Sequence, residues 1–249
     1  MNSKEISFKL RLKVLKTILF KDIKSEIRQI NDIFSVFLFE IISIFIFSSV
    51  YNFTTQIQNM PLEIFVIENW IIIFFTLIYI MVKLFVKEKE TGTLGGLITS
   101  PVSGNIILLS KILFCLILLI FVEAILFLTS SFLSAPAIIE GNITTQINLN
   151  VIQFLNYIII GILLPTFDLS ICGSLVSAFS MYVKNKSFIL PILLFPLILP
   201  IITPIISLNI KLLGGYSISD VFYEIIFLLA HIALMISIII LLSQTLLYD

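Results

Sequence analysis

Six long apolar segments run through the chain, and shorter polar stretches separate them. A helix needs about 20 mostly apolar residues to cross the hydrocarbon core of a bilayer. Backbone groups are not left unpaired in lipid, so each segment is expected to be helical. The pattern predicts an all-α integral membrane protein with one transmembrane domain, 1–249, and spans at 33–50, 70–86, 106–128, 151–181, 188–208 and 221–242. The fourth span is longer than a bilayer requires, and we expect a tilt or break near Pro165.

Composition supports lipid as the main solvent of this chain. Hydrophobic residues make up 59% of the 249 positions and charged residues only 12%, about half the charge of a typical soluble domain. The net charge is zero, which gives no reason to expect a nucleic-acid partner. Cys115 and Cys172 both fall inside apolar segments. We interpret them as small core residues, and the sequence predicts no metal site.

The basic residues are distributed unevenly around the predicted spans. Eight of the 15 precede the first span, and only Lys211 lies in an odd-numbered connection. Fourteen of the 15 therefore share one side of the membrane with both chain ends. Cytoplasmic connections are enriched in Lys and Arg. We expect a multi-pass protein of the cytoplasmic (inner) membrane with both termini in the cytoplasm.

Residues 1–32 are expected to form an amphipathic elbow helix before the first span. Apolar side chains recur every three or four positions, and lysines occupy the other faces. Such a helix lies along a membrane surface and is attracted to anionic lipid. A docking surface for a cytoplasmic partner is a second interpretation, and both stay open. The apolar positions are Phe8, Leu12, Leu15, Leu19, Ile23, Ile27 and Ile30.

The connection 87–105, between the second and third spans, has the pattern of a structured segment. Gly92 allows a turn that would strain other residues. Leu94 and Leu97 follow at helical spacing, and Ser100-Pro101 suits the start of a new helix. We expect a short helix across the membrane surface and then a sharp turn into the third span. Its apolar face needs a cover, which is either a cytoplasmic subunit or lipid.

This connection resembles the signature of ABC-2 permeases, in which the corresponding segment is the coupling helix that contacts the ATPase. The resemblance implies that eight residues take part in ATPase coupling: Glu88, Glu90, Gly92, Leu94, Leu97, Ser100, Pro101 and Lys111.

Nearly the whole chain resembles the heme exporter protein B (CcmB) family, the ABC-2-type permease of cytochrome c maturation. Asp168 departs from the family pattern. The stretches that carry the resemblance are Lys21-Asp22-x-x-x-Glu26-x-Arg28, Glu123 after Lys111, Gly173-Ser174-Leu175-Val176-Ser177-Ala178, and the proline-spaced series of Pro191, Pro196 and Pro200.

The resemblance implies several partners: a separate cytoplasmic ABC ATPase, a heme-handling membrane protein, a heme chaperone and a second copy of the chain in a homodimer. A phosphate-binding loop needs a Gly-Lys pair, and the chain contains none. We therefore expect a permease subunit and not an enzyme, with ATP on the partner, heme as a cargo and no cofactor bound directly. The alternatives are an ABC-2 exporter for another substrate and a membrane assembly scaffold.

Charged residues inside a span cost about 2.5–3.5 kcal/mol on insertion scales, so each needs a reason. Glu123, Asp168 and His231 are the deep candidates, for polar contacts between helices or for a rearranging conduit. Glu40 is expected nearer to a span end, where it reaches water. Imidazole binds heme iron, but a lone histidine such as His231 is more often a hydrogen-bonded packing residue.

The fifth span carries a series of prolines, with Pro204 after the three already named. Each proline removes a backbone donor and frees a carbonyl one turn earlier. We expect this helix to be bent or partly unwound, either to flex and contact a partner or as a static kink that fits the packing.

Overall fold

The computed structural model describes residues 3–55, 60–90, 92–93, 95–96, 104–134, 136–140, 143–146, 149–180 and 186–242. Within these residues, six helical segments are long and apolar enough to cross a membrane, as the sequence predicts. A further helix, α1 (Ser3–Ile27), precedes them. The first, third, fifth and sixth spans are α2 (Ile30–Thr55), α6 (Gly104–Ser134), α9 (Lys186–Leu213) and α10 (Phe222–Leu242).

The second and fourth spans each contain a π-helical turn. The second runs through α3 (Leu62–Met81), the π-helical η1 (Val82–Val86) and α4 (Lys87–Glu90). The fourth runs through α7 (Val151–Asn156), the π-helical η2 (Tyr157–Leu163) and α8 (Leu164–Ser180). A short 3-10 turn, η3 (Ile218–Val221), leads into α10.

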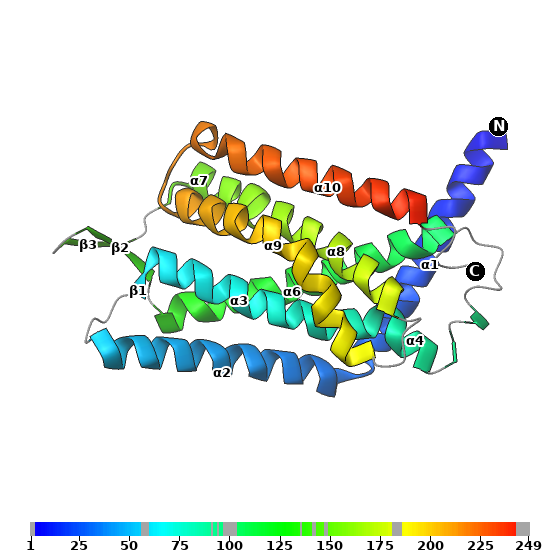
Figure 1. Cartoon of the computed structure of the whole chain (residues 1–249), viewed down its shortest axis with the longest axis horizontal. Helices are drawn as coiled ribbons and strands as arrows, with labels where there is room; N and C mark the ends of the chain where they lie inside the picture. The colour runs from blue at the N-terminus through cyan, green and yellow to red at the C-terminus, as the bar shows by residue number, and fades with distance from the viewer. Residues whose placement is uncertain are drawn as a thin grey trace.

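The six spans lie side by side, and α1 runs steeply across one end of the bundle (Figure 1). The segment α4 and the end of α10 lie at this end, which we call the basic end, and the strands lie at the opposite, sheet end (Figure 1). The spans built on α3 and α8 are the most buried, whereas α2 and α10 are mostly exposed. Apolar side chains cover the exposed faces of α2 and α10, as contact with lipid requires.

The second span begins earlier than the sequence predicts, at Leu62 and not at residue 70. The added length of the helix contains Glu68 and Asn69, and both are buried. Asn69 Nδ2 donates to the Phe65 carbonyl at 2.8 Å, and Ser134 Oγ lies 3.5 Å from a Glu68 carboxylate oxygen. Polar groups with partners inside the protein therefore extend this span. Helix α6 also runs beyond 106–128 at both ends.

A serine from α8 accounts for the π-helical turn η1. Ser177 Oγ donates to the Met81 carbonyl at 2.7 Å and accepts from the Phe85 amide at 3.2 Å. In an α-helix these two backbone groups would bond directly, so the inserted hydroxyl replaces that bond. Close packing brings Ser177 into place: a Cβ at Gly173 would lie 2.8 Å from Leu77 Cδ1.

The irregular part of the fourth span, η2, lies directly before Pro165, close to where a break is expected. Pro165 has no amide hydrogen for the carbonyl four residues earlier, which belongs to Gly161. Asn209 Nδ2, from α9, donates to that carbonyl at 3.0 Å. The span stays helical because a neighbouring side chain supplies the missing donor.

The four prolines of the fifth span lie inside one continuous helix, α9. Figure 1 shows that α9 bends along its length, with its first half inclined to the second. The expected bend is therefore present.

Three short strands at the sheet end are a feature that the sequence did not predict. They are β1 (Met60–Pro61), β2 (Pro136–Glu140) and β3 (Ile143–Gln146). β1 pairs in parallel with β2, and β2 pairs antiparallel with β3, with Ala137 opposite Gln146. The strands join the connection before α3 to the connection after α6.

The face of helix α1 that packs against the bundle coincides only in part with the one that the hydrophobic pattern indicates, since Ile23 packs against the core. Leu12 and Ile27, on the predicted apolar face, are exposed. The face that packs against the bundle contains Ile18, Asp22 and Glu26, one turn apart, and all three are buried. The pattern correctly predicts a helix here, but its packed face is partly charged and part of its apolar face is exposed.

Gly173→Val should destabilise the fold, because even one Cβ at this position lies 2.8 Å from Leu77. Overpacking of this kind typically costs about 1–3 kcal/mol. Thermal unfolding of the purified protein in detergent measures the loss. Ala233→Val, which enlarges an exposed residue of α10, is the control and should leave unfolding unchanged. Equal stability of the two variants would show that α3 and α8 are not closely packed here.

Candidate functional site

A buried lysine at the basic end forms ion pairs with acidic side chains from two other elements. Lys111 of α6 is only 1% exposed. Its Nζ lies 2.9 Å from a carboxylate oxygen of Asp22 on α1 and 2.9 Å from one of Glu88 on α4. Lys21 completes the group, at 2.7 Å from Glu88 and 3.3 Å from Asp22. We call these four residues the first ion cluster.

The first ion cluster holds two ammonium groups and two carboxylates, so its charges balance. Burial disfavours the charged form of Lys21, but the hydrogen bond with Glu88 and the charges of Asp22 and Glu88 outweigh it and raise the pKa of Lys21. The ammonium of Lys111 also faces the ring of Phe85, at 5.7 Å from its centroid. Balanced, closely paired charges are the form in which such groups tolerate burial.

A second ion cluster lies beside the first and consists of Glu26, Asp32, Lys83 and Lys87. Lys83, in η1, pairs with Glu26 of α1 and lies 3.8 Å from Asp32. Lys87 lies 3.6 Å from Asp32 and hydrogen-bonds Gln29. Here too two cations meet two anions. The π-helical turn of η1 sets the direction in which Lys83 leaves the helix, so the Ser177 insertion helps to place this cluster.

The coupling segment begins with a capped helix end. Gly92 has φ +71°, as expected for a turn that only glycine adopts without strain. The Thr93 amide donates to the Glu88 carbonyl at 3.0 Å and the Gly92 amide to the Lys89 carbonyl at 3.3 Å, which is a Schellman cap. Glu90 is exposed. The expected coupling positions Leu94, Leu97, Ser100 and Pro101 lie outside the described residues.

A groove of about 800 Å³ separates α1 from the segment that leads into the coupling turn. Both ion clusters contribute to its walls, and Lys13, Thr17, Thr93 and Gly96 also line it. The groove therefore has charged and polar side chains beside apolar ones. It lies at the basic end, where the elbow helix and the coupling turn face each other.

Among the deep intramembrane candidates, Glu123 contacts a neighbouring helix. Thr166 Oγ1, on α8, lies 2.8 and 2.6 Å from the two carboxylate oxygens of Glu123 and 2.7 Å from the Ile162 carbonyl. The expectation that Glu40 reaches water is wrong: it lies near the middle of α2 and is 1% exposed. The almost wholly apolar sequence around it does not show which side of α2 faces α6, and Glu40 lines one groove with Leu118 and Val122 of α6.

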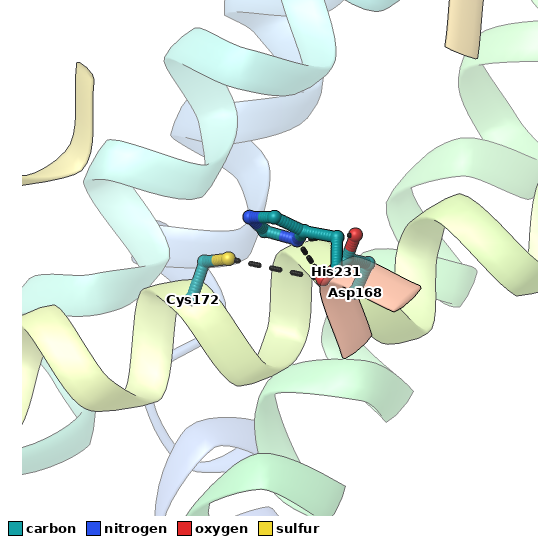
Figure 2. Close-up of side chains that lie close together, drawn as sticks. All are labelled: Asp168, Cys172 and His231. Carbon is teal, nitrogen blue, oxygen red and sulfur yellow. Dashed lines mark hydrogen bonds and ion pairs between the residues drawn. The ribbon is translucent and has the colours of Figure 1, made fainter. Parts of the chain in front are cut away.

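Asp168 and His231, far apart in the sequence, meet between α8 and α10. His231 Nδ1, from α10, lies 2.9 Å from each carboxylate oxygen of Asp168 on α8. Cys172, one turn after Asp168, has its Sγ 4.0 Å from Asp168 Oδ1. Figure 2 shows the three side chains pointing toward one another. Ligand atoms of the three residues all lie within 4.8 Å of one another, so together they could hold a metal ion.

Sequence reasoning named only part of this arrangement. It named Lys111 and Glu88, but it did not connect them with Asp22, and it assigned no role to Glu26, Lys83 or Lys87. The signal was present in α1, where Asp22 and Glu26 share a face with Ile18. Cys172 was treated as a packing residue, because nothing in its spacing brings it near His231.

A comparison with protein families gives one match across nearly the whole chain. The model of the family described as CcmB protein matches residues 13–243. The matched range includes both ion clusters, the coupling turn and all six spans. No curated protein and no solved structure matches the chain.

Lys111→Met should strongly destabilise the protein, because it removes the buried cation that lies 2.9 Å from a carboxylate oxygen of both Asp22 and Glu88. Removing one partner of a buried ion pair costs about 3–5 kcal/mol. Chemical denaturation in detergent measures the change.

Two further variants test whether the loss of stability comes from the buried ion pairs. Lys16→Met removes an exposed lysine of α1 and should leave stability unchanged. Adding Asp22→Asn to Lys111→Met should recover part of the loss, since it removes one unpaired charge. Wild-type stability of Lys111→Met would contradict the buried pairing.

Proposed function

The chain belongs to the CcmB family of heme exporter permeases of cytochrome c maturation, and we propose that it is the permease subunit of an ABC transporter complex whose ATPase is a separate polypeptide. The observation that carries this proposal is the family match over residues 13–243. The absence of a Gly-Lys pair supports a separate ATPase, because a phosphate-binding loop needs one. In this proposal ATP binds the partner, heme is a cargo, and no cofactor binds this chain directly for that activity.

The proposal assigns the basic end to the cytoplasm, with both termini on that side of the inner membrane. The excess of Lys and Arg at this end supports the assignment. The ATPase then docks on the coupling segment, through Glu90 and the turn at Gly92 and through Leu94, Leu97, Ser100 and Pro101. The groove between α1 and this turn adds charged and polar side chains to the same surface.

Coupling in this proposal passes through the first ion cluster. Glu88 lies four residues before Gly92, and it pairs with Lys21 on α1 and Lys111 on α6. Charges attract strongly where water is excluded, so a displacement of the coupling turn is transmitted to α1 and α6. Lys111 itself is buried and acts by holding these elements together, while exposed neighbours contact the ATPase.

The further partners that we propose are a second copy of the chain, other membrane proteins of cytochrome c maturation and a heme chaperone. ATP hydrolysis would then drive heme delivery or the release of the loaded chaperone.

Glu123, Asp168 and His231 provide polar contacts between spans that a movement of the spans during this cycle would rearrange. The prolines of α9, Pro191, Pro196 and Pro200, give that helix a bend that could change during the cycle.

Deleting the gene in its native cell should abolish covalently bound c-type cytochromes, because heme would not reach the apoproteins. Heme staining of membrane proteins after denaturing electrophoresis measures this. Re-expression of the wild-type chain is the control and should restore the bands. Normal cytochrome c levels in the deletion strain would instead favour an ABC-2 exporter of another substrate.

Gly92→Ala should weaken coupling while the ATPase stays bound. A non-glycine residue in the left-handed conformation costs about 1–2 kcal/mol, which corresponds to a shift of about fivefold or more in the population of the native turn. We expect a loss of similar size in the stimulation of ATP hydrolysis, measured on the co-purified complex in lipid.

Gly95→Ala is the matched control for this variant. Nothing lies within 4 Å of a Cβ added at Gly95, and its φ is not in the left-handed region, so stimulation should be unchanged. If both variants stimulate as the wild type does, the coupling assignment is wrong. If no ATPase co-purifies with the wild-type chain, the permease proposal itself fails.

A further inference from the structure

Among the residues that the structure describes, His231 is the one basic partner of the buried Asp168 carboxylate, and its ring is a counter-charge only when it is protonated. Asp168 has no exposed surface, and neither α8 nor α10 contains Lys or Arg. Both of its oxygens lie 2.9 Å from His231 Nδ1, yet that nitrogen carries at most one hydrogen. A buried carboxylate needs a cation or several donors to offset desolvation. The two carboxylate oxygens therefore have more acceptor capacity than the donors among the described residues, His231 Nδ1 and the weakly donating Cys172 thiol, satisfy.

A third donor atom lies at the same place. Cys172 is fully buried, and its Sγ lies 4.0 Å from Asp168 Oδ1, at the outer limit of a hydrogen bond. Asp168 and Cys172 are one turn apart on α8, so their side chains leave the same face of the helix. One oxygen, one nitrogen and one sulfur atom, all within 4.8 Å of one another, thus converge from two helices (Figure 2).

From this geometry we propose that Asp168, Cys172 and His231 form a binding site for one divalent metal ion of the zinc class. Zinc accepts carboxylate, imidazole and thiolate ligands at about 2.0–2.3 Å, which places tetrahedral ligands about 3.3–3.7 Å apart. The two recorded separations, 2.9 Å and 4.0 Å, fall on either side of this range, so modest side-chain rotations reach it. Water completes the fourth position.

Charge favours a divalent ion over other occupants. Binding displaces the proton of the Cys172 thiol, which leaves to solvent, so a thiolate, a carboxylate and a neutral imidazole surround the ion. Two negative ligands and a divalent cation leave no net charge in the membrane interior, where an uncompensated charge is costly. Asp168 and Cys172 have no exposed surface that could face a flat macrocycle, so the site fits a single ion and not heme.

The bound ion would fasten α10 to α8. The span built on α10 is among the least buried of the bundle, so a bond of this kind at its middle would add substantially to its attachment. Metal binding here is tested separately from ATPase coupling, because none of the three ligands belongs to either ion cluster.

Cobalt is the probe that tests this site, because a cobalt–thiolate bond gives a charge-transfer absorption in the near ultraviolet. The full-length protein, purified in detergent and stripped with a chelator, is titrated with Co²⁺. We expect one equivalent to bind with this absorption, and Zn²⁺ to displace it. Zn²⁺ should also raise the thermal unfolding temperature. A wild-type protein that shows no charge-transfer band refutes the proposal without any variant.

The chain offers a matched pair of thiol variants. Cys115 is also fully buried, but it lies on α6 and outside the three-residue donor set. Cys172→Ser should abolish the band and the stabilisation by Zn²⁺, whereas Cys115→Ser should retain both. Asp168→Asn and His231→Gln should each weaken Co²⁺ affinity by at least about tenfold. A band that survives in Cys172→Ser, or that disappears only in Cys115→Ser, overturns the assignment.

Discussion

The ammonium group of Lys111 is buried, and the packing of the basic end depends on giving it counter-charges inside the protein. Water cannot reach it, so the carboxylates must come from neighbouring elements. Asp22 comes from α1 and Glu88 from α4, and the pairing therefore holds three elements together. It also decides how α1 is rotated, because the helix turns its acidic residues inward and leaves Leu12 and Ile27 exposed.

The backbone groups of the spans, like the buried charges, must find partners inside the protein. Two of them contain π-helical turns, and in each case a side chain from another helix provides the hydrogen bond that the turn gives up. Ser177 does this for η1, and Asn209 does it for η2. Irregular backbone survives at membrane depth only where protein covers it. The π-helical turns therefore lie in the spans built on α3 and α8, which form the buried centre.

The peripheral span α10 is held to the bundle by polar contacts between side chains. α10 exposes most of its surface, and polar contacts fix it at two levels. His231 contacts Asp168 in the middle, while Glu224 pairs with Lys211 at 2.7 Å and accepts from Ser207 at 2.8 Å near the sheet end. Polar contacts are directional, so they set the rotation of a helix whose apolar packing alone would allow several. A permease that moves its spans can break such contacts one at a time.

The sequence by itself determined the six spans, the amphipathic character of α1, the turn at Gly92 and the membership of a permease family. These follow from apolar length, charge asymmetry and the short motif at Glu88 to Lys111, all of which are local properties of the chain. Only the tertiary structure decided which polar residues meet. It buried Glu68 and also Glu40, which was expected to reach water, and it brought Cys172 to His231. The physical reason is that lipid gives buried polar groups no solvent partner, so each must pair with whatever the neighbouring helix presents. The rotation and packing of the helices decide which side chains become neighbours, and the spacing of residues along one helix does not predict this.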